Sequence, residues 1–368
     1  MQKNNVKRID FSIVVCCYCG EKTIVSCLNS LIDQKYSNSD YEIVIVDDGS
    51  IDNSSDVIIR YVKRLNIKKP FIRYYRTENN GLSKARNFGI HHSNGRYILF
   101  IDEDAEADKN WLKEYSKLIF NSPFDIISGK MMEFPNSSIF QKFITRIHYT
   151  HMNPNGKEKI VLIGTNMGFN RDLFTGDVGF IDAFSYRGDE TALLTLLNGK
   201  GTLGTTKNAI VYHEQPKNIF LWLKERFVNG VLSIWIDELS KQLKINNTNR
   251  LELFYIKQIA RVSSWVWIPL SILSTFNNEI HNTLTIIIIV SFTIFLKRFF
   301  NRLNGKWILL SNNYSTILVL LLWPITSIIT MLGVLFEDVG RMYERITYKN
   351  KLFNKSSFAK NIIIEINN

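Results

Sequence analysis

Short apolar runs alternate with segments of mixed polarity along the first part of the chain. Four runs have the length and composition of buried strands: residues 11–17, 41–46, 71–75 and 97–101. Residues 21–34 read as a helix, and residues 81–92 place Leu82, Ala85 and Gly89 at helical spacing on one face. This alternation of continuous apolar strands with helices predicts a mainly parallel sheet covered by helices on both faces.

The pattern becomes less regular further along. Residues 125–133 and 160–169 are expected to form strands, residues 189–197 a helix, and residues 209–212 a last short strand that ends at His213. A turn-rich loop, residues 47–54, is suited to capping a helix that follows it. We therefore expect one α/β domain over residues 1–240.

Composition changes after about residue 250. Three segments are strongly apolar: residues 262–276, 284–296 and 315–336. Only the last comfortably reaches the ~20 residues that cross a bilayer, and the first could instead lie at the membrane interface. We expect membrane-associated helices over residues 251–340 and a basic tail over residues 341–368, which carries six Lys/Arg against two Glu.

Charge and processing signals suggest where the chain resides. No long apolar stretch opens the chain, so no cleavable signal peptide is expected. Basic segments beside apolar ones favour the cytoplasmic side, which predicts two full crossings, with one segment interfacial or re-entrant. We expect the inner membrane of the cell, membrane lipids as partners, and a cytoplasmic catalytic domain.

The net charge of +11 is compatible with nucleic acid, an anionic membrane surface or an anionic substrate. Much of the excess flanks the apolar segments, so a nucleic-acid partner is disfavoured. All four cysteines lie within the first 27 residues, with no second cluster for a zinc site. We interpret them as reduced, buried thiols, which is typical of cytosolic proteins.

The chain's strongest chemical signal follows the apolar run at residues 97–101. The run stops in Asp102-Glu103-Asp104. Three neighbouring carboxylates repel and raise each other's pKa, and a divalent cation with oxygen ligands relieves that repulsion. Ligands also bind at the carboxyl ends of strands in open α/β sheets. Asp102 and Asp104 are thus candidate metal ligands, the alternative being an acidic solvent loop before a helix near Asn110.

Two common nucleotide-binding signatures are missing. The first strand is not followed by Gly-x-Gly-x-x-Gly, and the chain has no Gly-x-x-x-x-Gly-Lys-Ser/Thr. This disfavours an NAD-binding Rossmann domain and a protein of the P-loop class.

Three motifs together resemble family 2 glycosyltransferases of the GT-A fold. They are Val46-Asp47-Asp48-Gly49-Ser50-x-Asp52, Asn80-Gly81-Leu82-Ser83-Lys84-Ala85-Arg86-Asn87-x-Gly89-Ile90 and Gly95-Arg96-Tyr97-Ile98-Leu99-Phe100-Ile101-Asp102-x-Asp104. The resemblance covers roughly residues 10–240. It implies a nucleotide-diphosphate sugar donor, a divalent metal (Mg²⁺ or Mn²⁺), inverting hexosyl-type transfer, and a lipid-linked or polysaccharide acceptor in cell-surface glycan synthesis.

The resemblance also implies donor-binding residues. Asp47 and Asp48 would bond the base or ribose, although their loop equally suits helix capping. Tyr18 and Glu21 follow the first strand, where the family's Pro-x-Tyr-Asn is replaced by Cys17-Tyr18-Cys19. Further donor-binding candidates are Arg86, which could contact the diphosphate or form a surface pair, and Asp102.

The remaining implied roles lie further along the chain. Asn166, in Gly164-Thr165-Asn166-Met167-Gly168-Phe169, would border the acceptor, unless the stretch is only a strand-to-helix turn. Asp189 or Glu190 would supply the catalytic base, in the reverse order to the family's Glu-Asp, or would stabilise a helix N-terminus. His213 would join Asp102 and Asp104 on the metal, or remain a lone exposed histidine.

Two other functions are compatible with the pattern. A membrane-tethered domain of this fold that lost activity would keep the strands, but it would be expected to lose part of the acidic set. A nucleotidyltransferase also uses paired aspartates on an α/β sheet. It has a glycine-rich basic loop after the first strand, where this chain has a single glycine between Cys17 and Lys22.

Overall fold

The computed structural model describes residues 9–65, 70–146, 151–152, 158–159, 161–175, 178–182, 184, 187–243, 289, 291–296, 326–341 and 343. The chain divides into two compact units. The first comprises residues 1–145, 160–216 and 360–368, and the second comprises residues 146–159 and 217–359. Each unit is described by itself.

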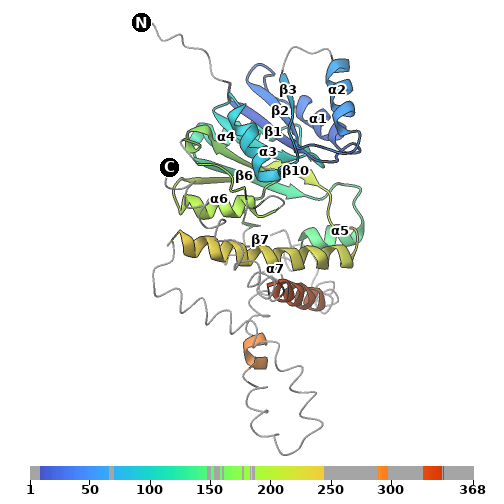
Figure 1. Cartoon of the computed structure of the whole chain (residues 1–368), viewed down its shortest axis with the longest axis vertical. Helices are drawn as coiled ribbons and strands as arrows, with labels where there is room; N and C mark the ends of the chain where they lie inside the picture. Colours follow the sequence, from blue (N-terminus) through green and yellow to red (C-terminus); the bar gives the residue numbers. More distant parts are fainter. Residues whose placement is uncertain are drawn as a thin grey trace, which may run out of the picture. The chain divides into compact units, whose positions relative to one another are not determined.

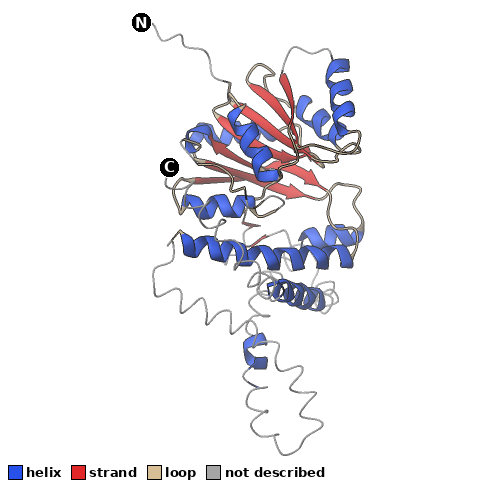
Figure 2. Cartoon of the chain, in the orientation of Figure 1, coloured by secondary structure: helices blue, strands red, loops and turns tan. Residues whose placement is uncertain are grey.

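The first unit is an α/β domain (Figures 1 and 2). Its elements are β1 (Phe11–Cys17), α1 (Ile24–Ile32), β2 (Tyr41–Asp47), α2 (Ser54–Leu65), β3 (Phe71–Arg76), α3 (Leu82–His91), β4 (Tyr97–Asp102), β5 (Ala105–Ala107), α4 (Trp111–Asn121), β6 (Ile126–Met132), α5 (Ile139–Ile144), β9 (Met167–Asn170), α6 (Asp189–Leu197) and β10 (Leu203–His213). A 3-10 turn, Arg171–Leu173, follows β9.

The eight strands form one mixed sheet in the order β3-β2-β1-β4-β9-β6-β10-β5. Strands β1 to β4 pair in parallel, as do β6 and β10, whereas β9 runs antiparallel to both of its neighbours and β5 antiparallel to β10. The expected strand over residues 160–169 is present only from Met167, as β9 (Met167–Asn170), and it is antiparallel to its neighbours rather than parallel. An apolar run carries no information about strand direction, so only pairing in the folded chain reveals this.

Alternating side chains of the strands pack into two hydrophobic cores, one on each face of the sheet. Phe11, Ile13 and Val15 pack with α1, α2 and α4 on one face, while Val14 and Cys16 pack with α3 and α6 on the other. Burial of both faces explains why the strands read as continuous apolar runs. The prediction of helices on both faces is thus confirmed within the described residues.

The strand register places the acidic motifs at one edge. Cys17 of β1 pairs with Asp47 of β2, and Cys16 pairs with Asp102 of β4. Because these strands are parallel, their carboxyl ends meet at the same edge of the sheet. The loops that follow them therefore enclose a common site.

Two motif glycines are required by close backbone approach. Gly49 has φ +70°, and a Cβ there would lie 2.6 Å from the backbone nitrogen of Asn79. Gly89 lets α3 lie against β1, since a Cβ there would lie 2.4 Å from Val14 Cγ1. These glycines keep the loop after β2 and the helix α3 close to the sheet.

All four cysteines are free thiols. Cys16, Cys17 and Cys27 are buried as expected, and burial raises the pKa of the Cys17 thiol to about 12. Cys19 differs from the expectation because it is exposed, in a turn with φ 58°.

The second unit contains the short pair β7 (His151–Met152) and β8 (Glu158–Lys159), the helix α7 (Ile219–Gln242) and helical residues 326–341. Arg226 of α7 bonds Glu337 at 3.4 Å, and a Cβ on Gly230 would lie 2.0 Å from the carbonyl oxygen of Glu337. Glycine therefore allows these two helices to cross closely.

The expected membrane segments fall largely outside the described residues. Residues 262–276 lie wholly outside them, as do most of residues 284–296, the first part of residues 315–336 and nearly all of the tail from residue 341. Among the residues that the structure describes, no helix has both the length and the apolar composition needed to cross a membrane.

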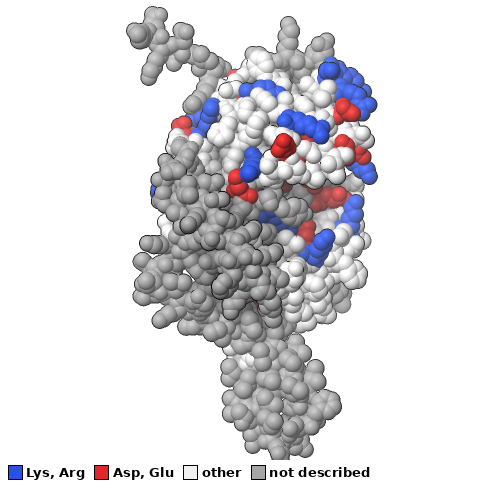
Figure 3. All heavy atoms as spheres, in the orientation of Figure 1, with Lys and Arg blue, Asp and Glu red and all other residues white. Residues whose placement is uncertain are grey.

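Surface charge is mixed where it is described. On the face shown in Figure 3, lysine and arginine side chains are spread among aspartate and glutamate side chains. The described part of this face therefore presents interspersed charge rather than one continuous basic patch.

Candidate active site

Three candidate metal ligands meet at the carboxyl end of β4. Asp102 is the last residue of β4, Asp104 lies in the turn to β5, and His213 ends β10. The antiparallel register pairs His213 with Ala105, directly after Asp104. One ligand atom from each of the three side chains lies within 4.8 Å of the others. The predicted set is therefore brought together by sheet pairing.

The electrostatics of this cluster suit a cation. His213 Nε2 lies 3.3 Å from Asp104 Oδ1. Burial alone would lower the pKa of His213, but the hydrogen bond and charge of Asp104 raise it to about 9. Burial alone would raise the pKa of Asp104, yet His213 holds it below its ordinary value. In this arrangement a proton on His213 supplies the positive charge beside Asp104.

The donor set fits a divalent cation. Two carboxylates and an imidazole are ligands for such ions, and His213 Nδ1 is a buried nitrogen without a hydrogen-bond partner among the described residues. An imidazole must be neutral to ligate, so metal binding would displace the proton held by His213 and Asp104.

The raised pKa of Glu103 reduces the repulsion among the neighbouring carboxylates after β4. Burial, then the charges of Asp104 and Asp102, raise its pKa to about 8. At neutral pH its carboxyl is therefore mostly protonated.

Arg86 joins this cluster to α6. Its guanidinium is buried, forms an ion pair with Asp189, and donates to Asp102 Oδ1 at 3.1 Å and to the Gly164 carbonyl at 3.3 Å. The rings of Phe100 and Phe180 lie 5.7 and 5.5 Å from its central carbon. Arg86 is therefore neither in a surface pair nor exposed to a diphosphate.

The buried charge of Arg86 is held by its carboxylate partners. Burial alone would lower the pKa of Arg86, but the charges of Asp189 and Asp102 raise it. Thr165 Oγ1 donates to the other oxygen of Asp102, Oδ2, at 2.6 Å. Both oxygens of Asp102 thus have fixed partners, which orients this candidate ligand as outer partners orient metal ligands elsewhere.

Asp189 and Glu190 differ sharply in environment. Asp189 is 1% exposed and paired with Arg86, whereas Glu190 is only partly buried. Burial, then the charge of Asp189, raise the pKa of Glu190 to about 7, and Arg86 offsets part of that shift. Glu190 is the less buried of the two candidate bases, and its raised pKa is suited to proton transfer near neutral pH.

Asn166 does not face an acceptor. It is 0% exposed, and its Oδ1 accepts from Trp111 Nε1 at 2.9 Å and from the Tyr115 hydroxyl at 2.6 Å. Its Nδ2 donates to the carbonyls of Lys130 and Ala209. The acceptor role expected for this side chain is corrected by its burial: Asn166 ties β6, β10 and α4 together.

Thr165 is the site residue that the sequence did not single out. It neighbours Asn166 in the same motif, and the turn at residues 164–166 directs one side chain to Asp102 and the other into the core. The motif at residues 164–169 indicated a functional turn, but it did not show which of its side chains points to the site and which points into the core.

The two aspartates at the end of β2 accept hydrogen bonds from groups within the domain. Asp47 is 0% exposed and accepts from the Ser50 backbone at 2.8 Å and the Tyr74 hydroxyl at 2.9 Å. Asp48 accepts from the backbone nitrogens of Asn80 and Gly81 at 3.0 and 2.8 Å. Burial is incompatible with ligand contact by Asp47, and Asp48 holds the loop before α3.

Tyr18 and Glu21 lie at the end of β1 and the start of α1. Tyr18 is 43% exposed. Glu21 Oε2 accepts from the backbone and the side chain of Asn53, at 3.2 and 3.0 Å. Tyr18 is thus available to a ligand, while Glu21 joins the start of α1 to the start of α2.

These observations define a class of protein: an α/β domain whose sheet edge gathers a two-aspartate, one-histidine cluster and an ionisable glutamate. Comparison with known proteins agrees with this class. Residues 12–176 match the family model described as Glycosyl transferase family 2. The match covers less than half of the chain, and the matched part carries Asp102 and Asp104.

Two curated relatives have named activities. The poly(ribitol-phosphate) beta-N-acetylglucosaminyltransferase TarS of Staphylococcus aureus is 33% identical over 121 residues, covering 33% of this chain and 21% of that protein. The poly(ribitol-phosphate) beta-glucosyltransferase of Bacillus spizizenii is 36% identical over 121 residues, covering 33% of this chain and 19% of that protein. The alignments thus span about a fifth of each relative.

A solved structure extends the likeness of fold. The mannosyltransferase PcManGT from Pyrobaculum calidifontis, in complex with GDP-Man and Mn²⁺, covers 92% of this chain and 88% of its own, with a TM-score of 0.53 and 14% identity. At that identity the likeness concerns the fold alone, and it agrees with the expected GT-A type of sheet.

Proposed function

We propose that this chain is a metal-dependent, inverting glycosyltransferase. Its donor would be a nucleotide-diphosphate sugar, and its acceptor a lipid-linked or polysaccharide glycan of the cell surface. The named activities of two relatives, poly(ribitol-phosphate) beta-N-acetylglucosaminyltransferase and poly(ribitol-phosphate) beta-glucosyltransferase, support a hexosyl donor and a polymeric acceptor. The alignments cover about a fifth of those proteins, so the complete activity is a proposal for this chain.

The observation that carries this proposal is the link between two chemically distinct groups at one sheet edge. Asp102, Asp104 and His213 form the candidate metal cluster, and Arg86 connects Asp102 through Asp189 to the start of α6, where Glu190 lies. An inverting transfer needs both charge neutralisation at the leaving group and a base for the acceptor hydroxyl.

A divalent cation held by Asp102, Asp104 and His213 would neutralise charge on the departing diphosphate. Glu190 would accept the proton of the acceptor hydroxyl as that oxygen forms its bond to the anomeric carbon. The bond from the anomeric carbon to the diphosphate breaks, and the diphosphate keeps the electron pair. Arg86 and Thr165 keep Asp102 oriented during this exchange.

A degenerate, inactive domain is less well supported. It would have no need to keep a partly exposed glutamate with a pKa of about 7 beside a buried Arg86–Asp189 pair. Purified protein incubated with nucleotide sugars, Mn²⁺ or Mg²⁺ and glycan or lipid-linked acceptors should release nucleoside diphosphate. Absence of nucleoside diphosphate release with every donor would refute the enzyme proposal.

We also keep membrane attachment and a cytoplasmic catalytic domain as proposals. Their support is the apolar segments after residue 250 and the basic tail, most of which lie outside the described residues. Fractionation tests this: the full chain should sediment with membranes and require detergent for release. Recovery in the soluble fraction without detergent would refute the attachment.

A further inference from the structure

Three polar side chains of the motif on α3 contact one stretch of chain that lies about a hundred residues further along. These side chains are Ser83, Lys84 and Asn87. The stretch comprises residues 178–182 and Phe184, and we call it the Phe180 segment. It precedes α6, the helix whose first turn carries the candidate base. The motif therefore has a partner within the domain, and that partner leads directly to the base.

Asn87 binds the Phe180 segment as a neighbouring strand would. Its Nδ2 donates to the carbonyl oxygen of Phe180 at 2.8 Å, and its Oδ1 accepts from the backbone nitrogen of the same residue at 2.8 Å. Gly179 allows this close approach, because a Cβ there would lie 2.8 Å from Asn87 Oδ1. A side-chain amide can donate and accept at once. Asn87 thus fixes the backbone of Phe180 with two bonds.

Two further contacts differ in strength. Ser83 is buried, and its hydroxyl donates to the carbonyl oxygen of Phe184 at 2.7 Å. Lys84 Nζ lies 3.6 Å from Asp182 Oδ2, but these two side chains are 49% and 40% exposed. Ion pairs with that much solvent access contribute little to stability. The bonds made by Ser83 and Asn87 therefore provide most of the attachment.

The attached segment packs against the buried arginine of the same motif. Phe180 is 3% exposed, and its ring centroid lies 5.5 Å from the central carbon of Arg86 and 5.2 Å from the ring centroid of Phe100. Arg86 in turn pairs with Asp189, the first residue of α6. The start of α6 is thus joined to α3 in two ways, along the chain through the Phe180 segment and across space through Arg86. Glu190, the next residue of α6, depends on both.

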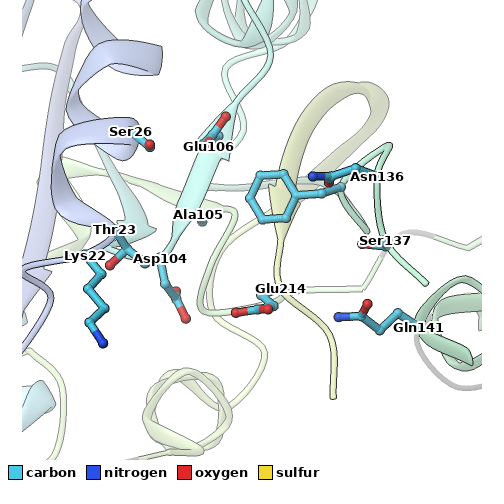
Figure 4. A pocket seen from close by; sticks show the side chains of 11 residues that line it. Lys22, Thr23, Ser26, Asp104, Ala105, Glu106, Asn136, Ser137, Gln141 and Glu214 are labelled. Carbon is cyan, nitrogen blue, oxygen red and sulfur yellow. The ribbon is translucent and has the colours of Figure 1, made fainter. Parts of the chain in front are cut away.

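The cavity beside the metal cluster involves other parts of the fold. It has a volume of about 360 Å³, and Figure 4 shows Asp104 at its wall together with side chains from α1, β5 and α5. No residue of α3 is among the described residues that line it. Ser83 and Asn87 therefore face the Phe180 segment rather than a ligand in this cavity.

We propose that Ser83 and Asn87 are positioning residues for the base: they hold the Phe180 segment so that Glu190 stays within reach of the acceptor hydroxyl. This inference rests on the proposed function, and it gives the motif on α3 a role other than binding the donor. Displacing a catalytic group by about 1 Å can cost about 100-fold in rate. The loss expected from loosening the segment is therefore in the chemical step, with donor binding kept.

Asn87→Asp tests the attachment with a side chain of the same shape. The carboxylate still accepts from the Phe180 nitrogen, but it cannot donate to the Phe180 carbonyl. We expect kcat to fall by about tenfold or more, while Mn²⁺-dependent binding of UDP or GDP, whichever the wild type binds, stays within about threefold. Asn208→Asp, at an exposed asparagine of β10, is the control and should leave both unchanged. Unchanged kcat, or weakened nucleotide binding that accounts for the loss, would overturn the proposal.

A double-mutant cycle separates positioning of the base from a general loss of structure. If Asn87 acts through Glu190, Asn87→Asp should lower kcat by less than about twofold in the Glu190→Gln background. A loss as large as in the wild-type background would overturn the proposal. Ser83→Ala removes one bond and little volume, so it should follow the same pattern with a smaller loss. It keeps the proposal testable if Asn87→Asp does not fold.

Hydrogen exchange tests the attachment without turnover. Asn87→Ala removes both bonds to Phe180 and should accelerate amide exchange in the Phe180 segment by about tenfold or more, with exchange in β1 unchanged. Unchanged exchange in the segment, or equal acceleration throughout the domain, would contradict the attachment. If the wild type releases no nucleoside diphosphate with any donor, the proposed transferase function fails. The exchange result still reports on the Phe180 segment in that case, so the two failures are distinguishable.

Discussion

Asp47 and Asp48 end β2, and Asp102 and Asp104 end or follow β4, two strands that flank β1 in the same sheet. At the β2 end, both carboxylates are buried, and every oxygen has a partner within the domain. At the β4 end, Asp104 is 41% exposed, and its Oδ1 lies 3.3 Å from His213 Nε2. Asp47 and Asp48 thus close a loop at one strand end. At the other end Asp104 stays partly exposed, while both oxygens of Asp102 accept from Arg86 and Thr165.

The difference lies in what surrounds each pair. The loop before α3 folds over Asp48, so its backbone nitrogens donate to the Asp48 carboxylate. The Asp47 carboxylate is bonded by neutral groups and lies 3.6 Å from Arg76. The β4 end is bordered by other ionisable groups, so burial and charge shift the pKa values of Glu103, Asp104 and His213. Shifted pKa values in a cluster are typical of functional sites.

The largest expected effect is at Asp104. Asp104→Ala removes a candidate metal ligand and should lower kcat by roughly 10³- to 10⁴-fold, since charge neutralisation at the leaving group is worth several kcal/mol. Thermal unfolding should change little because Asp104 is partly exposed. Asp56→Ala, at an exposed aspartate of α2, is the control, and normal turnover of Asp104→Ala in EDTA would refute the metal role.

Arg86 tests the connection between the metal cluster and α6. Arg86→Met leaves Asp189 and Asp102 without their shared cation, and it should lower the free energy of unfolding by about 3–5 kcal/mol. Arg86→Lys keeps a charge but cannot reach both carboxylates, so it should lose less stability yet still lose activity. Arg60→Met, at an exposed arginine of α2, serves as the control. If urea unfolding gives Arg86→Met the same free energy of unfolding as the wild type, the buried network of Arg86, Asp189 and Asp102 is not formed.

Glu190 tests the identity of the base. Glu190→Gln should lower kcat by roughly 10²- to 10³-fold, in line with loss of a positioned general base. In the wild type, activity should rise with pH through about 7, because the raised pKa keeps the carboxyl protonated and inactive below that value. A rate profile without that inflection, or a fully active Glu190→Gln, would exclude Glu190 in favour of another base.

The smallest effect is expected at the β2 end. Asp47→Asn should cost about 1–3 kcal/mol of stability, because a buried carboxylate with several donors is replaced by an amide that satisfies fewer of them. Its kcat should stay within about twofold of wild type at a temperature where the variant is folded. A large loss of donor affinity with unchanged stability would mean that Asp47 acts on the nucleotide after all.

Much of this arrangement could be predicted from the sequence. The strand Phe11–Cys17 and the helix Asp189–Leu197 have the predicted bounds, because continuous apolar runs and helical spacing are strong local signals. Asp102 and Asp104 were predicted as metal ligands from the acidic run itself, and His213 was added only by likeness to a family. The antiparallel pairing of β5 with β10 explains how the three meet.

Other features depend on contacts that no local pattern encodes. Arg86 lies on a helix where an arginine normally reaches solvent, and only the packing of α3 against Phe100, Phe180 and α6 buries it. Asn166 looked like a ligand because it is polar within a motif, yet four hydrogen bonds from distant elements enclose it. The proposal of Glu190 rather than Asp189 as the base likewise rests on the position of Arg86.

Metal binding compared at the two strand ends tests this account most directly. Mn²⁺ is titrated into wild-type protein, Asp104→Asn and Asp48→Asn, with a nucleoside diphosphate present, and free Mn²⁺ is followed by electron paramagnetic resonance. The account predicts that Asp104→Asn loses the bound ion, whereas Asp48→Asn retains it with an affinity close to wild type. Retention of the ion by Asp104→Asn, or its loss in Asp48→Asn, would contradict the assignment of reactivity to the β4 end.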